Sequence, residues 1–289
     1  IDTFQKAVYD WIIKYREGFT MKKRMLAVLL LIICVMPING CAFDKFTKSG
    51  NTNKNEDILI IGIDSEYEPY TYKNENGELT GIDIEISKEV CNRLGITPIY
   101  KAIPWDLKDE YLKNGTIDCV WSCFSYTGRE DKYQWAGPYL YSRQVVVVRN
   151  DSDIYHLSDL EGKLVSVMSS TKPESIFLDK LYDYIPDIKD LYCFKNLEYA
   201  FVAMRKGYTD AVSGHETAIK ICMDSDEENY RILDEALLKV QIGVAFDKDS
   251  TNQPVDDVSN VLKDMKEEGT IDKIVSKYGL EPDKVVRGK

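Results

Sequence analysis

The sequence predicts an α/β protein of two lobes, with the second lobe inserted into the first and a two-strand hinge between them. From Glu56 onward, short apolar runs alternate with amphipathic helical segments, a pattern typical of a parallel sheet covered on both faces. The alternation restarts at residue 164, and two extended segments, 143–150 and 240–248, bracket the second unit. With 289 residues, 44% of them hydrophobic, the chain can fill one or two cores.

The first lobe begins with an apolar run of buried-strand type, ILIIGI. Apolar residues spaced four apart, Ile82, Ile86, Val90 and Leu94, then predict a helix that Gly95 ends. In order, we expect a strand at 58–63, a helix at 81–95, a strand at 98–103, a helix at 105–112 and a strand at 117–121.

The second unit repeats this order, with strands at 164–168, 188–194 and 210–213 and helices after residue 171, at 197–206 and at 216–223. Two helices, around 255–268 and 271–278, complete the chain. We therefore expect lobe 1 to comprise residues 57–144 and 245–289, and lobe 2 to comprise residues 145–244 with the hinge strands.

The N-terminal part has an export pattern at residues 21–41. Three basic residues precede a fourteen-residue apolar run, 25–38, which as a helix reaches only about 21 Å, short of a ~30 Å hydrocarbon core. Ending on Ile38-Asn39-Gly40-Cys41, it resembles the lipobox of bacterial lipoproteins, which implies acylation of Cys41. A membrane anchor and a signal cut elsewhere remain alternatives.

The flanks of this signal differ in character. Residues 1–20 precede Met21, and we interpret them as an upstream extension, with a short amphipathic helix as the alternative. Residues 42–56 are polar and predict a flexible tether. The predicted product is an extracytoplasmic domain that a lipid anchors to the outer face of the bacterial cytoplasmic membrane.

Charge and cysteine content exclude several classes of partner. The net charge of −11, without a clustered basic face, disfavours nucleic acid. No cysteine or histidine spacing predicts a metal site, and we expect no cofactor. Five cysteines follow the signal, and we interpret them as small buried hydrophobes whose disulfide pairing stays open; they are Cys91, Cys119, Cys123, Cys193 and Cys222.

Polar and aromatic residues follow the predicted strands, where the crevice of an open parallel sheet lies. Tyrosines at 67 and 70 follow the first strand, Trp105 the second, and hydroxyls at 122 and 125 with Arg129 the third. Thr171 and Glu174 form an S/T-x-x-E capping box whose helix start can seat an anion. We expect guanidinium, hydroxyls and helix start to converge on one carboxylate.

Each of these features has a plainer interpretation. Arg129 could pair with Glu130 or Asp131, although adjacent residues pair poorly. Thr171 could be an ordinary cap, and the tyrosines and Trp105 could be packing residues.

Together, these segments resemble the family 3 extracellular solute-binding proteins of ABC importers, from about Leu59 to Tyr278. The stretches that carry the resemblance are IGIDSEYEPYTYKNENGELTGIDIEISKEV, GTIDCVWSCFSYTGRE, WAGPYLYSRQVVVV, LEGKLVSVMSST, IGVAFDKDS and MKEEGTIDKIVSKYG. The resemblance implies a clamshell of the type II periplasmic-binding-protein fold with a two-strand hinge. It also implies a small amino acid or related carboxylate as ligand, and an ABC permease as partner.

Residue roles follow from the same resemblance. Arg129, Ser125, Ser170 and Thr171 would hold a ligand α-carboxylate. Tyr67, Tyr70 and Trp121 would wall the pocket, and Asp64 would orient the loop of the first lobe. The candidate ligand-binding residues are Asp64, Tyr67, Tyr70, Trp105, Trp121, Ser122, Ser125, Arg129, Ser170, Thr171 and His215.

Two departures from the family pattern concern this site. One residue instead of two separates Thr127 from Arg129, and His215 stands where an aspartate commonly pairs with the ligand ammonium. A neutral imidazole brings no negative charge, and losing a charge-assisted bond would weaken amino-acid binding by about ten- to a hundredfold. Glu216 or Glu66 could replace that acid, the ligand could lack an α-amino group, or His215 could merely cap the next helix.

We therefore predict a monomeric, membrane-tethered receptor for an importer and not an enzyme. One alternative is a secreted dehydratase of cyclohexadienyl acids on the same fold, with Glu216, Glu174 or Glu66 as its acid. The other is a ligand-sensing co-receptor that feeds no transporter.

Overall fold

The computed structural model describes residues 57–289, apart from the side chains of 224–226. The predicted extension at 1–20, the signal at 21–41 with its lipidation site Cys41, and the tether at 42–56 lie outside the described residues. No helix in the described part is both long enough and apolar enough to cross a membrane.

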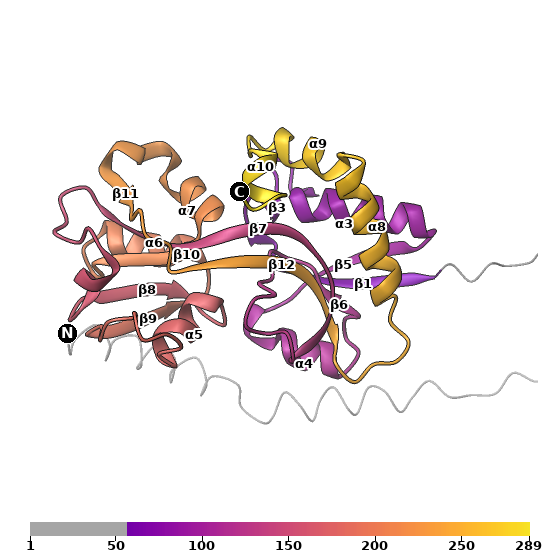
Figure 1. Ribbon diagram of the computed structural model, residues 1–289, viewed down its shortest axis with the longest axis horizontal. Coiled ribbons are helices and arrows are strands. Elements are labelled where there is room, and N and C mark those ends of the chain that lie inside the picture. Colours follow the sequence, from indigo (N-terminus) through magenta and orange to yellow (C-terminus); the bar gives the residue numbers. More distant parts are fainter. Residues whose placement is uncertain (1–56) are drawn as a thin grey trace, which may run out of the picture. The chain divides into compact units, whose positions relative to one another are not determined.

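A nine-stranded mixed sheet runs through both lobes in the order β5-β1-β6-β12-β7-β10-β8-β9, with β11 pairing to β7 (Figure 1). Lobe 1 contributes the parallel strands β1 (Ile58–Ile63), β5 (Thr97–Ala102) and β6 (Cys119–Val120). Lobe 2 contributes β8 (Leu164–Met168), β9 (Asp190–Phe194), β10 (Ala211–His215) and β11 (Tyr230–Ile232). The parallel order within each lobe confirms the predicted α/β class.

Helices cover both lobes. Lobe 1 has α3 (Ile82–Leu94), the 3-10 turn η1 (Trp105–Leu107), α4 (Lys108–Lys113), α8 (Val255–Glu267), α9 (Thr270–Lys277) and α10 (Pro282–Val285). Lobe 2 has η2 (Leu157–Leu160), α5 (Lys172–Leu178), α6 (Leu197–Arg205), α7 (Glu216–Met223) and η3 (Asp224–Asn229). A small antiparallel sheet follows β1 and consists of β2 (Glu66–Tyr67), β3 (Thr71–Lys73) and β4 (Leu79–Thr80).

Two long antiparallel strands, β7 (Tyr133–Arg149) and β12 (Leu238–Asp247), connect the lobes (Figure 1). Their pairing shifts register between Ile242 and Val244. β7 begins ten residues before the predicted segment 143–150, inside lobe 1, whereas β12 nearly coincides with the predicted segment 240–248.

The four consecutive valines of β7 explain why this segment is continuously apolar. Val146 and Val148 pack in one core of lobe 2, whereas Val145 and Val147 pack in the core on the other face of the sheet. Side chains alternate across a strand, so a strand buried on both faces needs apolar residues at every position. The run therefore marks the strand that both layers of lobe 2 cover.

Three details differ from the expectations. His215 belongs to β10 itself, so that strand ends two residues later than predicted. Thr171 begins α5 without a side-chain cap, since its hydroxyl donates to the carbonyl of Met168 (2.5 Å), and the predicted capping box is absent. Cys193 is exposed and not buried, because its strand β9 lies at the edge of the sheet, and Cys222 is only half-buried; the five cysteines of the described part are free thiols.

Candidate functional site

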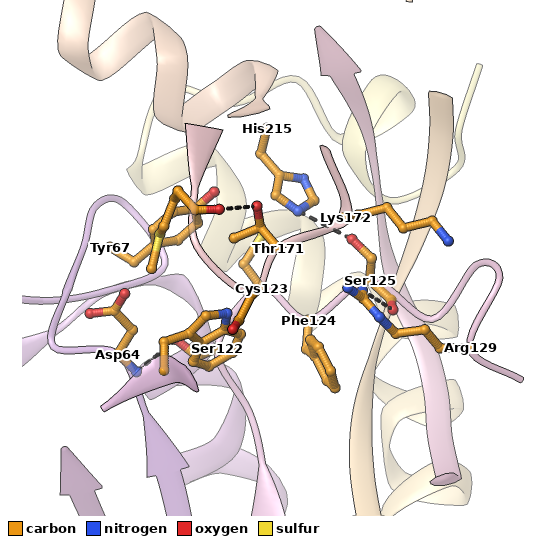
Figure 2. Close-up of a pocket in the computed structure, with 13 residues that line it drawn as sticks. Asp64, Tyr67, Ser122, Cys123, Phe124, Ser125, Arg129, Thr171, Lys172 and His215 are labelled. Atoms are coloured by element: carbon orange, nitrogen blue, oxygen red, sulfur yellow. Dashed lines mark hydrogen bonds between the residues drawn. The ribbon is translucent and has the colours of Figure 1, made fainter. Parts of the chain in front are cut away.

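A cavity lies at the strand ends of both lobes (Figure 2). Residues from both lobes line it: Asp64, Tyr67, Trp105, Ser122, Cys123, Phe124, Ser125 and Arg129 from lobe 1, and Met168, Ser170, Thr171, Lys172 and His215 from lobe 2. All the predicted site residues except Tyr70 and Trp121 are among them. A wider hollow adjoins this cavity and shares Asp64 and Trp105 with it.

Tyr70 and Trp121 are core residues of lobe 1, each 1% exposed, and neither lines the cavity. Trp121 directly follows the last residue of β6, and its ring packs 6.0 Å from that of Tyr139. Since side chains alternate along an extended chain, the next residue, Ser122, faces the cavity instead. Tyr70 stacks against Tyr67 at 6.1 Å between ring centroids and so supports the wall from behind.

The lobe 1 part of the site is built from backbone and hydroxyl contacts. Ser122 Oγ accepts a hydrogen bond from the Asp64 N–H (3.1 Å) and lies 2.6 Å from Thr71 Oγ1. Asp83, on the first turn of α3, accepts from the Cys123 N–H (2.6 Å) and from the Tyr139 hydroxyl (2.8 Å). These contacts hold Cys123 at φ +46°, a left-handed conformation that is strained for a residue with a side chain.

Arg129 is half-buried, and its guanidinium is attached to the site by weak contacts only. Nη1 donates to the carbonyl of Ser125 (3.2 Å), and Cζ lies 4.9 Å from the centroid of the Phe124 ring. Burial lowers the pKa of Arg129, which still leaves it protonated at neutral pH. Within the described part of the chain, no carboxylate forms an ion pair with Arg129.

The alternative pairing of Arg129 with its neighbour is absent. Glu130 instead accepts a hydrogen bond from the Gly128 N–H (2.9 Å), which lowers the pKa of Glu130. The glycine lies at φ +71° and turns the chain between Thr127 and Arg129. Despite the shortened spacing, the guanidinium therefore reaches the cavity.

The lobe 2 part of the site follows β8. Ser170, at φ +59°, donates its N–H to the Glu174 carboxylate (2.6 Å). The Glu174 carboxylate therefore accepts a hydrogen bond from a backbone N–H next to the start of α5, so that N–H is no longer free to bind an anion. The expected anion seat is thus weaker than the sequence predicted, although Ser170 and Thr171 both line the cavity.

His215 is 6% exposed and lies at the end of β10. Gln144 Nε2 donates to His215 Nε2 (2.9 Å), and Ser125 Oγ lies 3.3 Å from the same nitrogen (Figure 2). Burial, reinforced by the charge of Arg129, lowers the pKa of His215 to about 3, so the ring is neutral. Because an amide nitrogen only donates, Nε2 is the acceptor in this arrangement, and the buried Nδ1 has no hydrogen-bond partner among the described residues.

The acids that could replace an aspartate at position 215 are engaged elsewhere. Glu216 pairs with Arg143 (2.7 Å) and Lys220 (2.9 Å), and the hydrogen bond from Arg143 lowers its pKa to about 2. Glu66 accepts from the amide of Asn196 (3.1 Å). Asp64 is the one carboxylate among the residues that line the cavity, and burial raises its pKa.

The lobes touch across this cavity. Lys108 Nζ of lobe 1 donates to the Ser170 carbonyl of lobe 2 (3.3 Å), and the Glu66–Asn196 bond also crosses between lobes. Tyr67 packs against a core cluster of lobe 2. The site therefore depends on both lobes being close together.

Four lining residues were not predicted: Cys123, Phe124, Met168 and Lys172. The first two lie within the hydroxyl stretch after β6, and Met168 ends β8, so their places at strand ends were available as a signal. Nothing local distinguishes Lys172, the first residue of α5, from a solvent-exposed lysine.

Comparison with known proteins agrees with this architecture. The sequence profile of the bacterial extracellular solute-binding proteins, family 3, matches residues 59–281. The L-cystine-binding protein TcyA of Bacillus subtilis is 29% identical over 270 residues, which cover 89% of this chain and 97% of that protein. The histidine-binding periplasmic protein of Salmonella typhimurium is 27% identical over 76% of this chain and 86% of its own length.

Solved structures agree in the same way. The crystal structure of Tv2483 bound to L-arginine superposes with a TM-score of 0.70 at 28% identity, over 76% of this chain and 89% of that one. The ancestral amino acid-binding protein AncCDT-1, a precursor of cyclohexadienyl dehydratase, superposes with a TM-score of 0.67 at 27% identity, over 76% and 94%. The profile match, the insertion topology and the two-lobe cavity agree, and the chain belongs to the bacterial extracellular solute-binding proteins of family 3.

Proposed function

We propose that this protein captures a small amino acid or related carboxylate outside the cytoplasmic membrane and delivers it to the permease of an ABC importer. A lipid on Cys41 would tether it to the membrane, and residues 42–56 would be the tether. The names of its relatives support the ligand class, since they include cystine-, histidine- and arginine-binding proteins.

One observation carries this proposal: Arg129 enters a cavity shared by two lobes without an ion pair in the described part of the chain. A guanidinium presents parallel N–H groups that match a carboxylate. Ser125 and Thr171, from opposite lobes, lie around the same cavity; the Ser125 hydroxyl can donate a further hydrogen bond, whereas the hydrogen of the Thr171 hydroxyl is already donated to the Met168 carbonyl.

Capture would work by hinge closure about β7 and β12. A ligand that contacts both lobes stabilises the closed arrangement over the open one. Shifting the open:closed ratio from 99:1 to 1:99 needs about 5.5 kcal/mol of differential affinity, and a micromolar ligand supplies about 8.2 kcal/mol in total. A carboxylate held from both lobes can provide most of this difference.

A thermal-shift screen of the purified protein against amino acids and small carboxylates tests the proposal. A ligand at 100 times its Kd adds about 2.7 kcal/mol of stability, which raises the Tm by a few degrees for a domain of this size. If no amino acid or carboxylate raises the Tm, the proposed function is wrong.

A second candidate is a dehydratase on the same fold, which the similarity to a dehydratase precursor favours. Such an enzyme needs a carboxylic acid in the cleft to protonate a leaving hydroxyl. Glu216 and Glu66 do not line the cavity, and Glu174 binds the Ser170 N–H, whereas Asp64 lines the cavity with a raised pKa. Turnover of prephenate that Asp64→Asn abolishes would support this candidate over a binding protein.

A further inference from the structure

The two-residue strand β2 of lobe 1 reaches lobe 2 with both of its side chains. Tyr67 packs against the lobe 2 cluster that contains Leu197, the first residue of α6. Glu66 accepts a hydrogen bond from Nδ2 of Asn196, the residue that directly precedes α6 (3.1 Å). The polar half of this contact therefore joins a carboxylate of one lobe to a helix start of the other.

Asn196 is held in the orientation that this contact needs. It is 8% exposed, and its Oδ1 accepts a hydrogen bond from the Tyr199 N–H (2.9 Å), which caps α6. Because the cap engages the amide oxygen, the amide nitrogen must point the other way, and there it donates to Glu66. The same side chain thus begins a helix of lobe 2 and binds lobe 1.

The charges on the two sides of this contact are opposite. The wider hollow beside the cavity is lined by three acids of lobe 1, Asp64, Glu66 and Asp106, and by one ionisable residue of lobe 2, Lys195. Burial raises the pKa of Asp64, and the positive charge of Lys195 opposes that rise. The start of α6 adds the positive end of a helix dipole. Lobe 2 therefore attracts the Glu66 carboxylate at this edge of the cleft.

The contact lies outside the cavity that Arg129 enters. Glu66 lines only the adjoining hollow, and Asn196 lines neither. Separating the lobes about β7 and β12 would break the bond between these two residues, because each belongs to a different lobe. A bond that exists only while the lobes are close stabilises the closed arrangement, whichever solute is inside.

We propose that Glu66 and Asn196 form a latch, a hydrogen bond between the lobes that favours closure without contacting the solute. This inference rests on the proposed solute-binding function and concerns how firmly the site retains any ligand. Since apparent affinity scales with the population of the binding-competent form, a weaker latch should weaken every solute by the same factor. Loss of a direct ligand contact would instead weaken some solutes more than others.

Isothermal titration calorimetry with L-histidine, L-arginine, L-glutamine and L-glutamate tests the latch through two substitutions that keep a capping oxygen. Asn196→Ser removes the Nδ2 donor, and affinity for each bound amino acid should fall about two- to tenfold, the effect of one hydrogen bond. Asn196→Asp places a second carboxylate against Glu66, and like-charge repulsion should lower affinity by about tenfold or more.

A substitution in the other lobe provides the decisive comparison. Combined with Asn196→Asp, Glu66→Gln removes the repulsion and supplies an amide donor for the introduced carboxylate. We expect this double variant to bind within about threefold of the natural protein, because one hydrogen bond between the lobes is regained. An effect that arose only from the α6 cap would not be reversed by a change in lobe 1.

Asn114→Asp is the matched control for the added charge. Asn114 is an exposed residue of lobe 1 that accepts a local hydrogen bond from the Thr116 N–H (2.9 Å) and lines neither the cavity nor the hollow. This variant should bind each amino acid as the natural protein does. The ligand-free Tm of Asn196→Asp should stay within about 2 °C of the natural value, since asparagine and aspartate cap helices about equally well.

Three results would overturn the latch while the natural protein still binds its solute. They are an affinity of Asn196→Asp equal to that of Asn114→Asp, a loss that Glu66→Gln does not reverse, and a loss that differs tenfold between two bound amino acids. A natural protein that binds none of the four amino acids and no solute of the thermal-shift screen would contradict the proposed function itself.

Discussion

Arg129→Ala is the sharpest perturbation of the proposed clamshell mechanism. The substitution removes the guanidinium from the cavity while Ser122 and Ser125, held by backbone and side-chain contacts of their own, keep their places. In the ligand-free protein the guanidinium makes one hydrogen bond, to the Ser125 carbonyl, and a stacking contact with Phe124. Stability should therefore change little compared with the effect on ligand binding.

The magnitude follows from the two bonds that a guanidinium makes with a carboxylate. At about 1.5–3 kcal/mol for each bond to a charged group, their loss removes about 3–6 kcal/mol. At about 1.4 kcal/mol per factor of ten, affinity falls by about a hundredfold to ten-thousandfold. The loss is comparable with the roughly 5.5 kcal/mol needed to convert an open protein into a closed one.

Small-angle X-ray scattering with and without the best ligand of the thermal-shift screen measures closure directly. We expect the natural protein to become more compact on adding ligand, and Arg129→Ala to keep the same radius of gyration. Arg93→Ala is the matched control, because this arginine pairs with Glu89 and Glu268 on the outside of lobe 1 and its loss should not affect closure. Ligand-induced compaction of Arg129→Ala equal to that of the control would refute a carboxylate grip by Arg129.

Three further substitutions test the buried groups around the site. His215 has a pKa of about 3 in the folded protein and about 6.5 in the unfolded chain, so the unfolded chain binds more protons between these two pH values. The free energy of unfolding should therefore be greatest above pH 6.5 and fall toward pH 3. Urea unfolding of His215→Gln should lack this pH-dependent loss of stability. Burial raises the pKa of Asp83 to about 7, so the contribution of Asp83 to stability has the opposite sign: the free energy of unfolding falls as pH rises from about 3.9 through 7. If the slope of stability against pH is the same in Asp83→Asn as in the natural protein, this reasoning is wrong. Trp121→Phe should change ligand affinity by no more than about twofold, because the indole ring lies in the core and its unpartnered N–H is buried there. A tenfold loss of affinity in calorimetry would instead show that Trp121 forms part of the pocket wall.

Local signals predicted most of the fold correctly. The apolar runs ILIIGI and LVSVM are β1 and β8, and the four-residue spacing from Ile82 to Leu94 is α3. Segments whose signal is weak were missed, such as the two-residue strand β2 and the four-residue helix α10. Short elements are stabilised by contacts from elsewhere in the chain, so their own sequences carry little periodicity.

The same distinction applies to the site. Parallel strands place their carboxyl ends at one edge, and this rule alone brought Arg129, Ser125 and Thr171 to the cavity. The rule did not predict that Ser122 faces the cavity while Trp121 faces the core, because which of two adjacent side chains faces the cavity depends on where the strand ends. The actual strand β6 ends at Val120, one residue before the predicted end.

The sequence by itself determined the two-lobe α/β order, the hinge segments and the arginine-and-hydroxyl character of the cavity, because periodicity and strand-end position are local properties. Only the tertiary structure decided that His215 is buried and neutral, that Glu216 is held by Arg143, and that Trp121 lies in the core of lobe 1. Charge state and pairing depend on groups far apart in the chain, and folding alone determines which of them meet.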